Sequence, residues 1–269
     1  MEHEDVQVVY QSSRPGTVGN GPGTWTRSQP LLLEQLVIIG ALLSASTVGQ
    51  ALLRVDALDR RPYRGALYLF YVDGEMRLPA FYSTAILVLC AAGLAMAARR
   101  EDGSSGSRAP WAWLSLVFAV LAIDELLAFH ERSIHPLRDA LGIEGGLLFY
   151  AWIIPGFAVV ALVGLSFVPF LRRLPPRTRR GMIISGALFL SGALGVEALG
   201  GAFEAQVGAA SVPRSAGYTA LTTLEEGLEM VGAALFLSTI LRHLLSSPPP
   251  PGLLDTLARR VARWTVPST

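Results

Sequence analysis

The sequence has few charges, a single cysteine and no lysine. Only 16% of its 269 residues are charged and 51% are hydrophobic, whereas soluble domains carry about 25% charged residues. This composition excludes an ordinary water-soluble enzyme. All 22 basic residues are arginine and 21 acids nearly cancel them, so no basic field indicates nucleic-acid binding. Cys90 alone permits neither an internal disulfide nor a multi-cysteine metal site.

Long apolar runs are abundant instead. A hydrocarbon core about 30 Å thick is crossed by roughly 20 apolar residues in a helix. Runs of this length occur six times, at Leu31–Leu53, Leu78–Ala98, Trp111–Phe129, Leu147–Leu171, Gly181–Ala205 and Tyr218–Leu241. No alternating strand pattern is found. The sequence therefore predicts an all-α, polytopic membrane helical bundle of six transmembrane helices, with the lipid bilayer as its partner.

Polar segments flank the predicted six-helix domain, which spans residues 31–245. Residues 1–30 are rich in glycine and proline and are expected to form a disordered cytoplasmic tail. Residues 246–269 form a second tail. Within it, the apolar and arginine residues of 253–264 are typical of a short interfacial amphipathic helix, and an ordinary tail is an equal alternative.

The arginines predict an orientation. With a cytoplasmic N-terminus, the inner segments hold 14 arginines and the outer loops hold 8. This bias satisfies the positive-inside rule. Both termini are therefore predicted to be cytoplasmic, and the protein to lie in a cytoplasmic (inner) membrane.

Carboxylic acids interrupt the third, fifth and sixth spans. An ionised carboxylate at the bilayer centre costs about 2.5–3.5 kcal/mol, so such acids face the bundle interior, pair, protonate or hold a cation. Each span carries a stripe of polar residues on one helical face. The stripes are Asp124 and Glu131, joined by His135 if the helix continues, then Glu197 and Glu204, then Glu225 and Glu229.

Depth places the three stripes at the same level. Counted at 1.5 Å per residue, all of them fall in the outer half of the membrane. We therefore expect one carboxylate and histidine cluster there. Oxygen and nitrogen ligands suit a divalent ion such as Zn, Fe, Mn or Ca. The candidate metal ligands are Asp124, His130, Glu131, His135, Glu197, Glu204, Glu225 and Glu229, and further polar candidates are Glu75, Glu125, Glu226, Tyr218 and Thr222.

Three functional interpretations remain open. The first is a divalent-metal site of a membrane metalloenzyme or metal-handling protein, with unknown catalytic residues and a lipid or small hydrophobic molecule as candidate ligand. The second is a proton- or cation-coupled transporter, although the inner halves of the third and fifth spans offer only Ser115 and Ser185 to a through-path. The third is a non-catalytic sensor or assembly protein whose buried acids are protonated. A second copy of the chain, in a homo-oligomer, is a candidate partner under each interpretation.

Other features have structural explanations. Trp111, Trp113, Tyr150 and Trp152 lie near span ends, where an aromatic belt is expected. Pro155 could kink the fourth span. The Glu197 face carries Gly186, Ala193, Gly200 and Gly201, small residues that let a neighbouring helix approach closely.

Four runs also carry a resemblance. They are FYVDGEMRLPAFYS (70–83), AIDELLAFHE (122–131), GVEALGGAFE (195–204) and LEEGLEMVGAALF (224–236). Their succession of acidic motifs resembles an uncharacterised family of bacterial multi-pass membrane proteins. The likeness covers most of residues 65–242. It implies a prokaryotic cytoplasmic membrane and draws attention to Glu75, and it brings no known activity.

Overall fold

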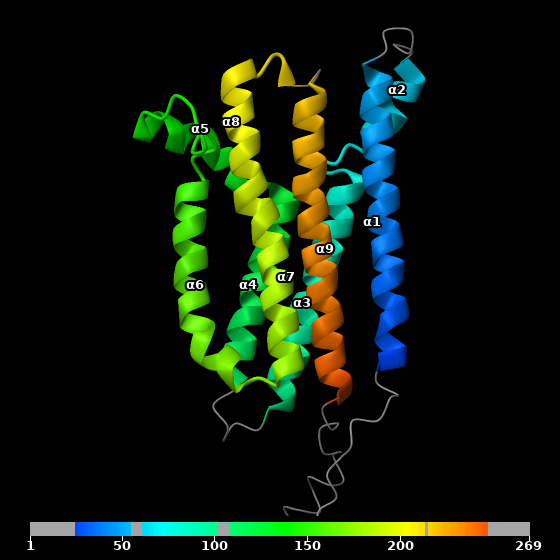
Figure 1. Ribbon diagram of the computed structural model, residues 1–269, viewed down its shortest axis with the longest axis vertical. Helices are drawn as coiled ribbons and strands as arrows, with labels where there is room; N and C mark the ends of the chain where they lie inside the picture. The colour runs from blue at the N-terminus through cyan, green and yellow to red at the C-terminus, as the bar shows by residue number, and fades with distance from the viewer. Residues whose placement is uncertain (1–24, 55–60, 102–107, 213–214, 247–269) are drawn as a thin grey trace, which may run out of the picture.

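The computed structural model describes residues 25–54, 61–101, 108–212 and 215–246. All regular structure in these segments is helical, and six helices are long and apolar enough to cross a membrane. This confirms the predicted all-α bundle of six spans (Figure 1). The spans are α1 (Trp25–Leu53), α3 (Leu78–Arg100), α4 (Arg108–Leu127), α6 (Ile153–Arg173), the continuous unit of α7 (Pro176–Leu190), η3 (Ser191–Val196) and α8 (Glu197–Val207), and α9 (Ala216–Ser246).

Two shorter helices lie at one end of the bundle. Helix α2 (Arg61–Tyr68) follows α1, and α5 (Phe129–Leu141) follows α4. Figure 1 shows α5 lying across the long axis of the bundle, at the end where α8 is found. The residues expected to form the terminal tails, 1–24 and 247–269, lie outside the described residues, and so does the amphipathic segment 253–264.

Helix α9 is the centre of the packing. It contacts α1, α3, α7, η3 and α8, while α3 and α4 form a second extensive pair. Helix α6 is the most peripheral span, and η3 is its close neighbour (Figure 1). The acids of α8 and α9 are therefore held on adjacent helices.

Glycines allow the α7–η3–α8 unit to lie directly against α9. A Cβ atom on Gly192 would be 2.6 Å from the carbonyl oxygen of Glu225, and one on Gly232 would be 2.7 Å from the amide nitrogen of Phe189. Neither side chain could be added without a shift of backbone. Small residues of this kind let membrane helices approach closely.

The predicted small-residue face does not make this contact. A Cβ atom on Gly186 would meet nothing within 4 Å, and those on Gly200 and Gly201 would approach Tyr150. The prediction was wrong for Gly186, because the π-helical segment η3 lies between it and Gly200 and Gly201, and the wider turn of η3 changes their relative positions around the helix. Gly192, which regular helical spacing did not single out, carries the contact.

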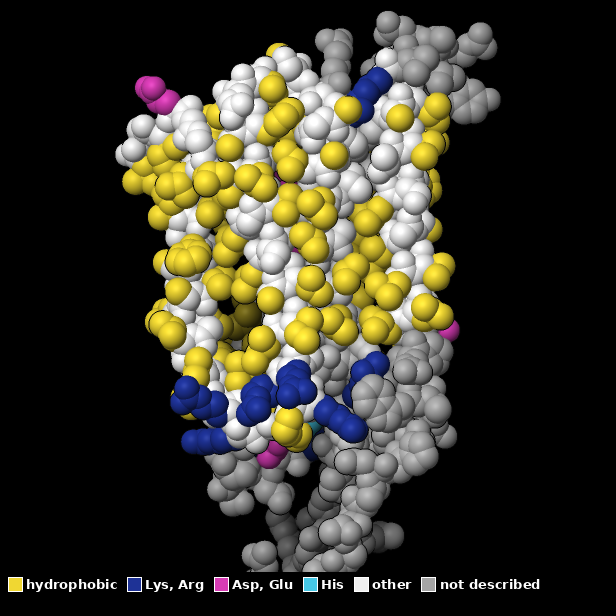
Figure 2. Space-filling view, viewed as in Figure 1, with side chains coloured by type: hydrophobic (Ala, Val, Ile, Leu, Met, Phe, Trp, Pro, Cys, Tyr) yellow, Lys and Arg dark blue, Asp and Glu magenta, His cyan; other side chains and the backbone are white. Residues whose placement is uncertain are grey.

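Arginines gather at the end of the bundle opposite α5 (Figure 2). They come from the last turns of α3 and α6 and from the first turns of α7, with hydrophobic side chains covering the surface above them. Trp111 lies near this end and was expected to sit in an aromatic belt. It is instead fully buried, with its ring 4.9 Å from that of His243, whereas Trp113 is 63% exposed.

Two spans differ from the expected boundaries in ways that shape the site. The fourth begins at Ile153 rather than Leu147, because the residues before it form turns. Pro155 therefore lies in the first turn of α6, where proline is tolerated, and does not kink the span. The third ends at Leu127 because the next residue, Ala128, adopts a left-handed conformation.

Candidate functional site: an acidic pocket

One cavity of about 370 Å³ collects the acids of five elements. Its acidic lining consists of Asp73, Glu75, Asp124, Glu125, Glu131, Glu197, Glu204, Glu225, Glu226 and Glu229. Basic groups in the lining are His130, His135 and Arg138. All eight candidate metal ligands thus face one cavity, together with Glu75, Glu125, Glu226 and Tyr218. Thr222 does not line it, and its hydroxyl donates to the Thr219 carbonyl oxygen at 3.3 Å.

The pocket is open at one end and closed at the other. Asp73, Glu75 and Glu131 lie at its mouth with part of their surface in solvent, while the surrounding protein shields the carboxyl groups of Asp73 and Glu131. Leu87, Leu121 and Phe189 also line the cavity. Each lies nearer the arginine end than the other lining residues of its span, which is α3, α4 or the α7–η3–α8 unit. These apolar side chains belong to or pack against the hydrophobic core. Within the described residues the cavity is therefore a blind pocket with an apolar floor.

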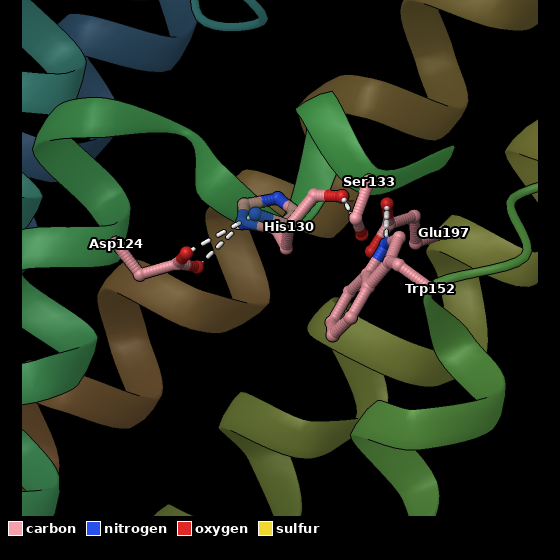
Figure 3. Close-up of polar contacts among 5 residues, drawn as sticks. All are labelled: Asp124, His130, Ser133, Trp152 and Glu197. Atoms are coloured by element: carbon pink, nitrogen blue, oxygen red, sulfur yellow. Dashed lines mark hydrogen bonds and ion pairs between the residues drawn. The ribbon is translucent and has the colours of Figure 1, made fainter. Parts of the chain in front are cut away.

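The junction between α4 and α5 shapes one wall. Ala128 has φ 46° and ψ 49°, a left-handed conformation that costs an alanine about 1–2 kcal/mol. The Asp124 carboxylate stabilises this turn, because it accepts the His130 amide N–H at 3.1 Å while its other oxygen lies 2.5 Å from His130 Nδ1 (Figure 3). Asp124 thus satisfies a free amide in the first turn of α5.

This break overturns the expectation that Asp124, Glu131 and His135 form a stripe on one helix. Asp124 belongs to α4, and the other two belong to α5, which runs in another direction. They face the same cavity because the chain turns at Ala128, and regular helical spacing is not the reason.

His130 connects the α4 wall to the α8 wall. Its ring lies 4.8 Å from that of Trp152, whose indole N–H donates to Glu197 Oε1 at 2.6 Å. Figure 3 shows His130 between Asp124 on one side and the Trp152 and Glu197 pair on the other. Burial alone would lower the pKa of His130, but the Asp124 hydrogen bond and nearby carboxylates raise it above its usual range. Its protonated form is therefore favoured.

A tyrosine pair holds the outer acid of α8. The Tyr150 hydroxyl donates to Glu204 Oε2 at 2.6 Å and lies 3.1 Å from the Tyr218 hydroxyl. The Tyr150 ring can come this close because Gly201 has no side chain, and a Cβ atom there would lie 3.0 Å from the ring. Tyr150 and Trp152 thus point into the protein, contrary to the expected aromatic belt.

The loop before α3 contributes the mouth of the pocket. The Val72 amide donates to Ser46 Oγ at 3.0 Å, which fixes the loop to α1. The Tyr71 hydroxyl donates to Asp73 Oδ2 at 2.9 Å. Burial raises the pKa of Asp73 to about 7, partly opposed by this hydrogen bond. Glu75 lies 3.7 Å from Arg132 in an exposed ion pair.

Burial also raises the pKa of Glu131, and the nearby His130 opposes the shift. Two acids at the mouth therefore hold their protons to higher pH than in water. The charge of Asp73 at the entrance therefore changes near pH 7.

Among the acids of the pocket, the three on α9 have the fewest partners to offset a negative charge. Glu225, Glu226 and Glu229 line the cavity, and none has a hydrogen bond or ion pair within the described part of the chain. Ion pairs found along the pocket are Asp124 with His130 and Glu75 with Arg132. Glu197 lies within electrostatic range of Glu225 and Glu229. Negative charge is therefore concentrated between α8 and α9.

No preassembled metal centre is found in the described ranges. No three His, Cys, Asp or Glu side chains there are placed to hold one ion together. Oxygen ligands of a divalent ion lie about 2.0–2.6 Å from it. The acids are thus distributed around the cavity rather than gathered at one point.

Sequence reasoning missed several residues of this site. Trp152, Tyr150 and Arg138 line the pocket, and the first two hydrogen-bond its acids directly. No spacing pattern could identify them, since Tyr150 and Trp152 lie in the turns between α5 and α6 and Arg138 lies in the last turn of the short helix α5. The only available signal was the position of two aromatic donors beside a span rich in acids.

Comparisons with known proteins show the family but no activity. Neither the curated proteins nor the solved structures include a match to this chain. A family model described as a domain of unknown function (DUF8692) matches residues 35–244, well over half of the chain, and the protein therefore belongs to this family.

Proposed function

We propose that this integral membrane protein binds a cation in its acidic pocket, between α8 and α9. The observation that carries the proposal is the absence of partners for Glu225, Glu226 and Glu229 among the described residues. Acids within a membrane are costly unless they pair, protonate or hold a cation. A bound cation would offset the repulsion among these neighbouring carboxyl groups.

Two kinds of cation fit the chemistry of the pocket. A divalent ion such as Zn, Fe, Mn or Ca suits its oxygen and imidazole ligands. The acids would then have to move together, since no three are placed to share one ion within the described residues. An organic ammonium group needs no such gathering, because its several N–H donors can reach carboxylates distributed around a cavity. The volume of about 370 Å³ favours this larger cation.

A blind pocket supports binding over conduction. Leu87, Leu121 and Phe189 close the cavity toward the arginine end, where a transporter would need polar groups to continue. The proposal therefore treats the pocket as a receptor or reaction site that opens at one end of the bundle. If the positive-inside rule holds, this end is extracytoplasmic.

The test is direct binding to protein in lipid nanodiscs. Wild-type protein is titrated with Mn²⁺, followed by electron paramagnetic resonance, and separately with butylammonium, followed by calorimetry. The double variant Glu225→Gln, Glu229→Gln removes two charges while keeping side-chain size. The matched control is Glu144→Gln, which neutralises an exposed acid outside the pocket.

We expect saturable binding of one of the two cations to wild type and to the control, and at least a tenfold loss of affinity in the double variant. Circular dichroism and gel filtration establish that the variant is folded. Single variants at each position serve the same purpose if the double variant does not fold. No saturable binding of either cation, or binding unaffected by the variants, would overturn the proposal.

A further inference from the structure

An apolar groove runs beside the acidic pocket, along α6. Its volume is about 470 Å³, and its lining comes from α4, α6, α7 and α9. Apart from Ser185 the lining side chains are hydrophobic or glycine. Figure 2 shows the surface hollowed between α6 and α7, with hydrophobic side chains around the hollow.

The length and position of the groove suit an extended hydrocarbon chain. On α6 its lining extends from Val159 to Leu171, which is about 18 Å at 1.5 Å per residue. Both residues belong to a span that crosses the membrane. The loose packing of α6 on the bundle leaves this space unfilled by protein.

The groove and the acidic pocket adjoin each other. Leu121 and Phe189 line both cavities, and they form part of the apolar floor of the pocket. The apolar groove therefore lies against the wall of the chamber that Glu225 and Glu229 line. A molecule that filled both spaces would displace the Leu121 and Phe189 side chains that lie between them, and it would have a hydrocarbon tail and a polar head.

The charge of the pocket defines that head. Its acidic lining far outnumbers the basic side chains His130, His135 and Arg138. Glu226 and Glu229 are half-buried and have no hydrogen-bond partner within the described segments. An anionic head would meet repulsion here, whereas a primary ammonium group carries three donors and a complementary charge.

We propose that the protein binds a single-chain amphiphile with a primary amine head, whose ammonium group enters the acidic pocket while its alkyl tail lies in the α6 groove. This inference rests on the proposed cation site and adds the class of ligand. Burial of the tail in the groove contributes little binding free energy, because the membrane interior from which the tail comes is also apolar. The groove therefore acts by fitting and orienting the tail, and the acids supply the selectivity for charge.

Glycine positions allow a sharp test of the groove. Gly186 lines it, and a Cβ atom there would meet nothing within 4 Å, so Gly186→Leu fills the space without forcing backbone to move. Gly164→Leu does the same from α6. Gly40→Leu on α1 is the matched control, because its Cβ atom is equally unhindered and it lies outside both cavities.

The experiment measures how well dodecylammonium and butylammonium displace isotopically labelled butylammonium from protein in nanodiscs. The quantity compared is the ratio of their inhibitory concentrations. Partitioning of the longer amine into the bilayer raises this ratio equally in every protein, so the difference between variants reports the groove. We expect the ratio to fall at least tenfold in Gly186→Leu and Gly164→Leu and to be unchanged in Gly40→Leu.

Each result has a distinct meaning. A fall in the ratio with unchanged butylammonium affinity supports a tail site in the groove. An unchanged ratio in both groove variants overturns the inference, because it shows that the alkyl tail does not bind in the groove, and it leaves the cation site intact. If wild type binds Mn²⁺ but not butylammonium, the amine head is wrong while the cation site stands. If it binds neither, both proposals fail.

Discussion

The His130 ring nitrogen Nδ1 lies 2.5 Å from Asp124 Oδ2, and this contact ties the end of α4 to the start of α5. The two residues are six apart, with the left-handed Ala128 between them. One carboxylate therefore stabilises a strained turn and a helix start, and it also sets the charge of the imidazole that faces Trp152. The wall of the pocket depends on this pair.

Asp124→Asn is expected to weaken that wall. The amide keeps an acceptor for the His130 N–H but loses the charge, and a hydrogen bond to a charged group contributes about 1.5–3 kcal/mol. The pKa of His130, which Asp124 raises, should fall. Histidine NMR titration in nanodiscs measures the pKa. Asp139→Asn, an exposed change on α5, the helix that carries His130, is the control. Equal titration curves for Asp124→Asn and wild type would refute this account.

The same pair predicts a pH dependence of stability. A histidine whose pKa is raised by folding contributes stability that is fully present below its unfolded pKa of about 6.5 and is lost as the pH rises through the higher folded value. Wild type should therefore lose more thermal stability than Asp124→Asn as the pH rises through that window. Parallel melting-temperature curves from pH 6 to pH 9 would contradict the prediction.

Asp73 should titrate near neutrality. Burial raises its pKa to about 7, and the Tyr71 hydroxyl opposes this shift. The folded protein thus holds this proton more tightly than the unfolded chain, so the contribution of Asp73 to stability falls as the pH rises from 3.8, its ordinary value, to about 7. Difference infrared spectra should show a carboxylic-acid band that disappears near pH 7 and is absent in Asp73→Asn.

Tyr71→Phe provides the second arm of that measurement. It removes the hydrogen bond that lowers the pKa of Asp73, so the midpoint of the band should move to higher pH. A midpoint that stays in place, or a band that survives Asp73→Asn, would show that another acid is observed.

Gly192 and Gly186 should respond in opposite ways to alanine. Gly192→Ala places a Cβ atom 2.6 Å from the Glu225 carbonyl oxygen and is expected to destabilise the protein by about 1–3 kcal/mol. Gly186→Ala meets no atom within 4 Å and, because alanine has the higher helix propensity, should stabilise it by up to about 1 kcal/mol. The melting temperatures of both variants are compared with that of wild type in the same detergent. Equal shifts for the two variants would show that η3 does not pack closely against α9.

Trp152→Phe removes the only described hydrogen bond to Glu197, which is 6% exposed. Leaving this buried group without its donor should cost about 1–3 kcal/mol. Trp113→Phe is the control, because Trp113 is 63% exposed and has no described partner in the pocket. Similar melting temperatures for the two variants would mean that the indole does not position Glu197.

The spans could be predicted from the sequence because a run of about 20 apolar residues has few alternatives to crossing a bilayer. The turn at Ala128 could not, since neither glycine nor proline marks it, and the tertiary contact of Asp124 stabilises it. The π-helical segment around Gly192 was equally hidden. Its extra residue per turn leaves no signature in composition.

The acids could be identified from the sequence because a carboxylate within a membrane span carries a large energetic cost. The side chains that donate hydrogen bonds to these acids could not be identified in this way. Tyr150 and Trp152 are ordinary residues for a span end, and only the turns that precede α6 direct them inward. The sequence likewise could not reveal that the acids surround a cavity without three of them meeting, because that depends on side-chain positions across five elements.

The central claim is that the deep acids of α9 hold the cation, and carbodiimide labelling tests it at the residues themselves. Peptide mass spectrometry measures the labelling rates of Glu225 and Glu229, with exposed Glu144 as internal reference. Saturating Mn²⁺ or butylammonium should slow labelling of the deep acids at least tenfold and leave Glu144 unchanged. Deep acids that react at the same rate with and without either cation would contradict the account.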